Sequence, residues 1–272
     1  MGITMTSLIS WIGIDQRGPA SAYFASDSRI TWGGKNGWEH GRKLFASSKY
    51  PHILGYCGDV LFPTQTLSQV IEMIDAGLLL DNSDTIDVSV EKMVSVISSA
   101  FDTYPSTAKK RFEVLYCFRE GDGVSALFHL RHIVFDPIQA PRVSIINLPA
   151  HSDIVANLGT GAVSMRASLE PWKASEVGGT SRAVFSAFSD SLRSGIDRNS
   201  AGPPQLVGLQ RRFAAKTFGI VWEQRRYFYG LEVDLVTSST DVRWFNDRLE
   251  ICDPQTMSRR IDAQPQPRPR GL

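Results

Sequence analysis

The sequence lacks a dominant charge and any long hydrophobic run. Lys and Arg number 29 against 28 Asp and Glu, which gives a formal net charge of +1. A chain without a strong positive field has no general attraction for nucleic acid or for an anionic membrane surface. Its apolar stretches are also far shorter than the roughly 20 residues that a membrane-spanning helix needs. We therefore expect neither nucleic acid nor a membrane as a partner.

Cysteine is scarce, and its placement argues against both a disulfide framework and a metal site. Cys57, Cys117 and Cys252 are an odd number without metal-type spacing, which favours a reducing, cytoplasmic environment. His129 and His132 are three apart on a predicted strand, so they point to opposite faces and make a poor metal pair. No phosphate-binding glycine loop is present either. We expect no metal and no cofactor.

What the chain does contain is ordinary globular composition, with 42% hydrophobic and 21% charged residues over 272 positions. This length can bury a sizeable core. Residues 1–5 are expected to be a short extension and 6–252 a single domain. Apolar content then falls, and the Pro-rich segment 253–272 is expected to be a disordered tail.

Hydrophobic periodicity predicts strands, two helices, strands, two helices and strands, in that order. This order lacks the βαβα alternation of a doubly wound parallel sheet. It favours an α+β fold in which two antiparallel sheets are stacked and each carries a helix pair, a four-layer αββα sandwich. The expected strands are 7–14, 22–26, 52–58, 112–120, 124–136, 142–148, 153–159 and three within 204–232; the expected helices are 62–80, 88–104, one limited by Pro171, and 181–195.

Several short motifs occur in a telling order. Thr6 and Ser7 open the first strand, Asp-Ser-Arg-Ile-Thr (27–31) follows the second, and Lys43 comes next. The later motifs are Gly58 at a strand end, Gly-Thr-Gly at 159–161, and Asp197 with Ser200 ahead of a strand. In this order and strand–helix context, residues 6–232 resemble the proteasome β-type family of N-terminal-nucleophile (Ntn) threonine hydrolases. Two bacterial branches resemble the chain most: the heat-shock peptidase with an ATPase partner, and the ancestral β-subunit type called Anbu.

The resemblance implies that Thr6, once freed as the first residue, is the catalytic nucleophile of a peptidase. A Thr hydroxyl needs an adjacent base, and a free α-amine with a pKa near 8 can accept its proton. Lys43 would favour the alkoxide by its charge, and Asp27 would orient Lys43 and keep it charged. Met5 departs from the family pattern, in which the removed propeptide usually ends in Gly.

The remaining expected roles also follow from the resemblance. The backbone N–H of Gly58 would stabilise the oxyanion, and Asp197 and Ser200 would support the Thr6 amine and hydroxyl. The Asp197–Ser200 pair has an equally good reading as a plain helix-to-strand loop. Thr160 stands where the family has a serine.

Three residues are expected to contact substrate along with Thr160. Thr31 would pair its backbone with an extended peptide. Tyr56 and Ile30 are expected to line an uncharged pocket that prefers small or medium apolar side chains.

The expected partners are a peptide or unfolded protein as substrate, further copies of the chain, and an ATPase. Two alternatives remain open at this point. One is a catalytically silent structural subunit in which Thr6 is never freed. The other is an Ntn amide hydrolase that acts on a small molecule.

Overall fold

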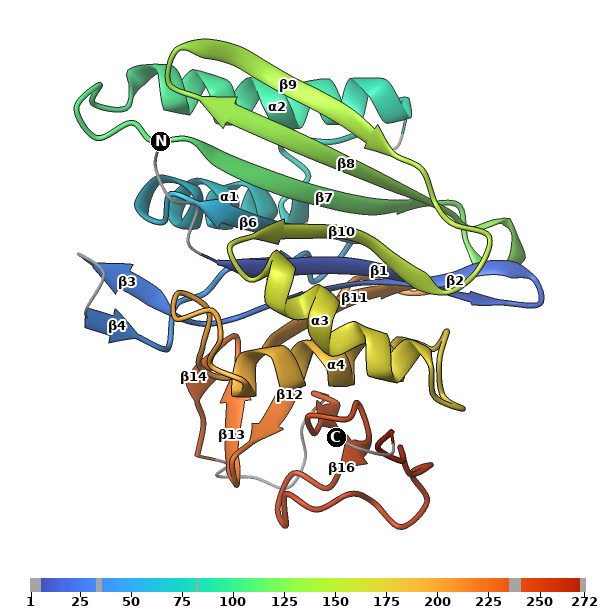
Figure 1. Cartoon of the computed structure of the whole chain (residues 1–272). Helices are drawn as coiled ribbons and strands as arrows, with labels where there is room; N and C mark the ends of the chain where they lie inside the picture. The colour runs from blue at the N-terminus through green and yellow to red at the C-terminus, as the bar shows by residue number, and fades with distance from the viewer. Residues whose placement is uncertain (1–5, 33–35, 82, 235–240, 270–272) are drawn as a thin grey trace.

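The computed structural model describes residues 6–32, 36–81, 83–234 and 241–269; the predicted extension 1–5 lies outside the described residues. Within them the chain forms four α-helices and sheets of nine, five and two strands (Figure 1). Strand pairs are antiparallel except for β15, which runs parallel to β12. The predicted combination of helices with mainly antiparallel sheets is confirmed.

The first two strands of the chain form a hairpin in the interior of the larger sheet, with another strand on each side of it. The order of this sheet is β10-β1-β2-β11-β12-β13-β14, and β15 and β16 are attached through β12. Ser7 pairs with Gly159 and Ser26 pairs with Gln205, so the start of β1 lies beside the ends of β2 and β10 and the start of β11. The bounds are β1 (Ser7–Asp15), β2 (Gly18–Ser26), β10 (Asp153–Gly159), β11 (Gln205–Gln210), β12 (Lys216–Trp222), β13 (Arg225–Phe228), β14 (Leu231–Glu232), β15 (Trp244–Phe245) and β16 (Ile251–Cys252).

The five-stranded sheet follows chain order, β5-β6-β7-β8-β9, as successive antiparallel neighbours. A short ribbon of two further strands, β3 and β4, projects beside the larger sheet (Figure 1). The bounds are β3 (Ile30–Trp32), β4 (Asn36–Trp38), β5 (Leu44–Ala46), β6 (His52–Gly58), β7 (Phe112–Glu120), β8 (Leu127–Asp136) and β9 (Gln139–Ile146).

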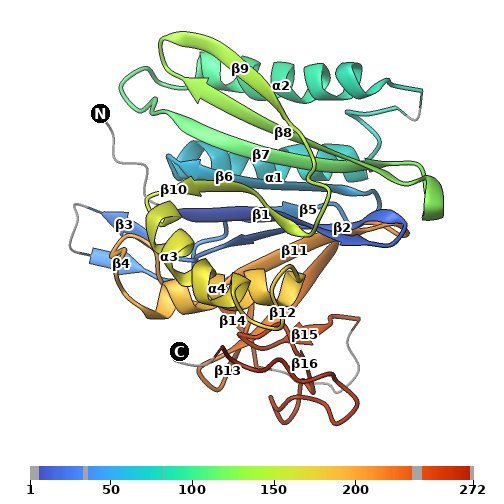
Figure 2. The same cartoon turned by 45° about the vertical axis from the view of Figure 1, so that its right-hand side comes forward.

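The helices fall into two pairs, α1 with α2 and α3 with α4, and the pairs lie on opposite sides of the molecule in both views (Figure 2). Side-chain caps begin two of them: Thr85 accepts the N–H of Val88, and Thr180 accepts the N–H of Ala183. The bounds are α1 (Leu61–Asp75), α2 (Ile86–Thr103), α3 (Ala162–Lys173) and α4 (Ser181–Arg193).

Three large apolar clusters and a small fourth one, around Val221, Trp244 and Cys252, fill the interior. One joins α1 and α2 to the five-stranded sheet, and a second joins α3 and α4 to the larger sheet. The third combines side chains of both sheets, such as Leu8 and Phe24 with Leu44 and Ile53. Strands that contact two clusters are apolar on both faces, which explains their continuous hydrophobic runs.

Two details differ from the sequence-based expectations. Pro171 does not end α3, which continues to Lys173 because Trp172 is fully buried and its Nε1–H donates to Asp190 Oδ2 of α4 at 2.9 Å. Tertiary packing here outweighs the loss of one helical N–H. The first predicted helix is also shorter than expected, since α1 ends at Asp75.

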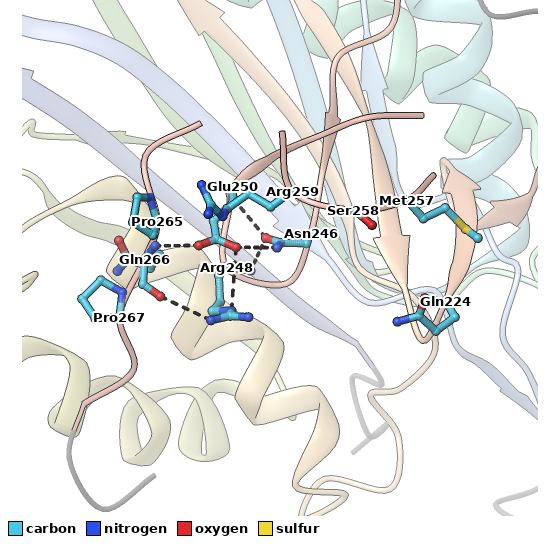
Figure 3. A pocket seen from close by; sticks show the side chains of 10 residues that line it. All are labelled: Gln224, Asn246, Arg248, Glu250, Met257, Ser258, Arg259, Pro265, Gln266 and Pro267. Atoms are coloured by element: carbon cyan, nitrogen blue, oxygen red, sulfur yellow. Dashed lines mark hydrogen bonds and ion pairs between the residues drawn. The ribbon is translucent and has the colours of Figure 1, made fainter. Parts of the chain in front are cut away.

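The Pro-rich segment, described as far as residue 269, contacts the body of the protein through a few buried residues. Gln266 is buried, and its N–H donates to Glu250 Oε1 at 2.6 Å (Figure 3). Asn246 Nδ2 holds the other oxygen of Glu250 at 2.7 Å. One oxygen of the buried carboxylate thus holds the tail at Gln266, and the other is held by Asn246. None of the helices in the described part of the chain is long and apolar enough to cross a membrane.

The cluster that joins α1 and α2 to the five-stranded sheet, called the helix-side cluster below, gives a stability prediction. Phe112 is fully buried, and its ring lies 4.7 to 5.4 Å from the rings of Phe62, Phe101 and Phe135. Replacing Phe112 by Ala should lower the free energy of unfolding by about 3–5 kcal/mol, because the cavity adds to the lost burial. Ile138→Ala, at an exposed position, should change it by less than about 0.5 kcal/mol. Urea unfolding of both variants measures the difference, and equal effects would contradict the packing described.

Candidate active site

The carboxylate of Asp27, directly after β2, is the acceptor on which the predicted site is centred. Its Oδ1 accepts the N–H of Ser7 at 3.0 Å and the ammonium of Lys43 at 2.8 Å. Its Oδ2 accepts the N–H groups of Arg29 at 3.0 Å and Ala201 at 3.3 Å. Three backbone N–H groups and one ammonium from separate segments therefore converge on one buried carboxylate.

Lys43 lies just before β5, and its side chain is completely buried, as is that of Asp27. Burial lowers the pKa of Lys43 below its usual value, and the charge and hydrogen bond of Asp27 oppose that shift only in part. Cys57 and Asp197 are also near enough to act on the Lys43 charge. The ammonium is thus closer to losing its proton than that of a surface lysine, while Asp27 acts to keep it charged.

Thr6 is fully buried at the entrance to β1. Its carbonyl accepts the N–H of Gly161 at 3.5 Å. A Cβ on Gly159 would lie 1.8 Å from the Thr6 carbonyl oxygen, and Gly159 has a φ of +85°, so only glycine fits at this position. The Gly-Thr-Gly motif therefore serves to let the backbone before β1 approach the end of β10.

A second carboxylate, Asp197, holds two hydroxyl groups of the predicted site. Thr160 Oγ1 and Ser200 Oγ each donate to Asp197 Oδ2 at 2.7 Å. A Cβ on Gly161 would lie 2.6 Å from Ser7 Cβ and 3.1 Å from Ser200 Oγ, so this cluster lies against the start of β1. The structure thus brings Asp197, Ser200 and Thr160 beside the Asp27–Lys43 pair.

Gly58 ends β6 on the side that faces Lys43. The N–H of Tyr56 donates to the Lys43 carbonyl at 3.2 Å. Backbone N–H groups two residues apart in a strand point toward the same neighbouring strand. We therefore expect the Gly58 N–H to point to the same side of β6 as the Tyr56 N–H that binds Lys43. Gly58 has a φ of +106°, and a Cβ there would lie 2.8 Å from the Arg111 carbonyl oxygen.

The predicted substrate residues occupy two different environments. Ile30 and Thr31 lie on the β3–β4 ribbon, where Thr31 pairs with Gly37. Tyr56 belongs instead to the helix-side cluster: it is fully buried, and its hydroxyl bonds with Thr64 Oγ1 at 2.6 Å. These contacts differ from the expected role of Tyr56 in a substrate pocket.

Two residues outside the predicted catalytic and substrate set connect the site. Arg29 donates to the Arg198 carbonyl at 2.8 Å and forms an ion pair with Glu39, which ties together the two loops around the site. Gln205, at the start of β11, bonds to the backbone of Lys43 and of neighbouring residues. Arg29 stands in the Asp-Ser-Arg-Ile-Thr motif, where a structural role is expected of it, whereas sequence reasoning missed Gln205. No motif marks Gln205.

The described residues give little support to a functional site elsewhere in the molecule. No group of three His, Cys, Asp or Glu side chains is placed to hold a metal in the part of the chain that the structure covers. A pocket of about 570 Å³ lies in the C-terminal segment, where Arg248, Glu250 and Gln266 contribute to its lining (Figure 3). Its lining includes none of the predicted site residues.

Comparison with known proteins gives a likeness at the level of structure. No protein-family model matches the chain, and no curated protein matches it. Among solved structures, the chain is similar to the crystal structure of eukaryotic HslV from Trypanosoma brucei, with a TM-score of 0.47 and 12% identity. That alignment covers 75% of this chain and 99% of the other. With so few shared residues, the case for each site residue has to come from its own contacts in this chain.

The contacts of Asp27 predict that the two partners of the buried ion pair differ in their effect on stability. Asp27→Asn removes the counter-charge of a fully buried ammonium and should cost about 3–5 kcal/mol of the free energy of unfolding. Lys43→Met leaves Asp27 with three N–H donors and should cost only about 1–3 kcal/mol. Urea unfolding at pH 7 measures both.

The double variant is the control for this comparison. Because the two side chains are in direct contact, removing both should cost less than the sum of the single losses by about 0.5–3 kcal/mol. Strictly additive losses, or a larger loss for Lys43→Met than for Asp27→Asn, would contradict the described geometry.

Proposed function

We propose that the chain is a threonine peptidase whose nucleophile is Thr6, exposed as the first residue after removal of residues 1–5. The observation that carries the proposal is the completely buried Lys43–Asp27 pair, joined through Asp27 to the N–H of Ser7, the residue after Thr6. Burying an ammonium costs desolvation free energy, and purely structural sites seldom retain a buried ammonium. Perturbed, buried ionisable groups cluster at functional sites.

The proposed chemistry begins with proton transfer from the Thr6 hydroxyl to the Thr6 α-amine. The hydroxyl oxygen then attacks the peptide carbonyl, and the leaving amine takes the proton as the C–N bond breaks. Water hydrolyses the resulting ester and restores Thr6. Burial lowers the pKa of Lys43, so its ammonium can share a proton with the attacking oxygen in the transition state more readily than a surface lysine could.

Other residues take supporting roles in this proposal. The Gly58 N–H, directed toward the Lys43 edge of β6, would donate to the oxyanion. Asp197 would hold the Thr6 amine through Ser200 and Thr160, whose hydroxyls it already accepts at 2.7 Å. Thr31 would offer backbone groups of β3 to an extended peptide, with Ile30 beside it.

The wider assignment rests on the sequence motifs. We propose the αββα arrangement of Ntn hydrolases, an assembly of identical subunits, a peptide or unfolded-protein substrate and a possible ATPase partner. The three cysteines are unpaired, which supports the cytoplasm as the location. An amide hydrolase of this class acting on a small molecule would differ by forming no large assembly.

A silent structural subunit is the second candidate, and one observation favours it. Thr6 is 0% exposed, so a chain that retains residues 1–5 presents no nucleophile to solvent. The two candidates therefore differ in whether the bond before Thr6 is cleaved.

Cleavage of that bond predicts the mass of the purified protein. If Thr6 acts as proposed, intact-mass spectrometry of the full chain should detect a species that begins at Thr6. The same chain with Thr6→Ala should keep residues 1–5 if the site itself performs the cleavage. An active preparation that contains only chains beginning at Met1 or Gly2 would contradict the proposed nucleophile.

A chain produced with Thr6 as its first residue tests the chemistry directly. It should hydrolyse short fluorogenic peptides, and Thr6→Ala or Lys43→Met should lower kcat by about 10³-fold or more, since both groups act in one proton-transfer unit. Lys92→Met is the matched control, because Lys92 forms a surface ion pair with Asp84. A folded Thr6-first chain without hydrolysis would favour the silent subunit instead.

A further inference from the structure

Gln205 is a fully buried amide at the centre of the loops that form the candidate site. Its Oε1 accepts the backbone N–H of Lys43 at 3.0 Å. Its Nε2 donates toward the Gly41 carbonyl at 2.7 Å, the Ser28 hydroxyl at 3.0 Å and the Asp27 carbonyl at 3.2 Å. One side chain thus contacts the residues that carry both partners of the buried ion pair.

These contacts leave only one orientation of the amide. A donor, the Lys43 N–H, faces one end of the group, and two carbonyl oxygens and a hydroxyl face the other end. Turning the amide over would bring its NH₂ group against the N–H of Lys43 and its oxygen against two carbonyls. A buried amide in such a mismatch would leave several polar groups unsatisfied, so the observed orientation is strongly preferred.

The position of Lys43 needs such a fixed partner. Lys43 precedes β5, whose first paired residue is Leu44, so its backbone lies at the end of the ladder. Tyr56 binds the Lys43 carbonyl from one side, and Gln205 binds the Lys43 N–H from β11. β11 belongs to the nine-stranded sheet and β5 to the five-stranded sheet. Gln205 therefore links these two sheets at Lys43, the residue just before β5.

We propose that Gln205 is a positioning residue that holds the Lys43 backbone where its ammonium reaches Asp27. Gln205 acts on the reaction only through Lys43 and Asp27. The kinetic part of this inference rests on the proposed threonine peptidase, but the effect on Lys43 itself does not.

The experiment compares Gln205→Met with a matched loss of a buried hydrogen bond elsewhere. Met keeps the length of the side chain and removes every polar contact of the amide. Tyr116→Phe is the control, because the Tyr116 hydroxyl bonds His52 on the five-stranded sheet at 2.8 Å. Both are made in the chain that begins at Thr6, and melting temperature and assembly size are measured for each.

We expect Gln205→Met to lower kcat for a fluorogenic peptide by about 10- to 100-fold, because a displacement of roughly 1 Å has that effect on an aligned site. KM should change by less than about threefold, since Gln205 is buried away from substrate. Tyr116→Phe should leave both constants unchanged. An unchanged kcat in folded Gln205→Met would overturn the inference.

A second readout is independent of catalysis. In a protein whose lysines carry ¹³C at Cε, NMR titration reports the pKa of Lys43, assigned by its loss in Lys43→Met. Gln205→Met should lower that pKa further and Tyr116→Phe should not, because a displaced ammonium loses the charge and hydrogen bond of Asp27. An unchanged Lys43 pKa would overturn the positioning role even if the chain shows no peptidase activity.

A further variant guards against a simple folding defect. Gln205→Glu keeps the shape and the acceptor for the Lys43 N–H, and it replaces the donor that serves the Gly41 and Asp27 carbonyls. It should show the same loss of kcat and a perturbed pH profile. If neither variant at position 205 folds while Tyr116→Phe does, Gln205 is a structural residue and the positioning role is overturned.

Discussion

The ion pair between Lys43 and Asp27 constrains the structure around it because both side chains are completely buried. An ammonium removed from water loses several kcal/mol of hydration, which a single carboxylate offsets only with good geometry and further hydrogen bonds. Asp27 supplies that geometry because three backbone N–H groups hold it from different segments. The carboxylate therefore ties together the loops before β11 and after β2.

Much of the fold could be predicted from the sequence, because periodicity and turn residues reveal elements locally. The opening hairpin and the order of strands and helices agree with the structure. The segments carrying Thr6, Asp27, Lys43 and Asp197 also meet at one end of the larger sheet, since that end collects the start of β1 and the end of β2. Their catalytic roles remain predictions, because the geometry alone does not show the reaction.

Local sequence patterns could not predict other features of the structure, for physical reasons. Tyr56 and Cys57 are neighbours on a strand that is buried on both faces, so no polar alternation indicates which of them faces the helices. Gln205 binds mainly backbone groups. Residues of nearly every type carry the same backbone groups, so no sequence motif marks these partners. In the tail, the contact of Gln266 depends on a buried carboxylate, Glu250, that lies outside the segment, and composition does not reveal such a partner.

The donors around Asp27 also determine when the site can form during synthesis. Ser7 and Arg29 emerge early from the ribosome, whereas Ala201 and Gln205 follow only after most of the chain has been made. Until that late segment pairs with β2, the carboxylate lacks one N–H donor and the Lys43 backbone lacks its amide partner. A nascent chain therefore carries Asp27 and Lys43 in an incomplete site. The site is completed only when the long-range pairing of β11 with β2 has formed.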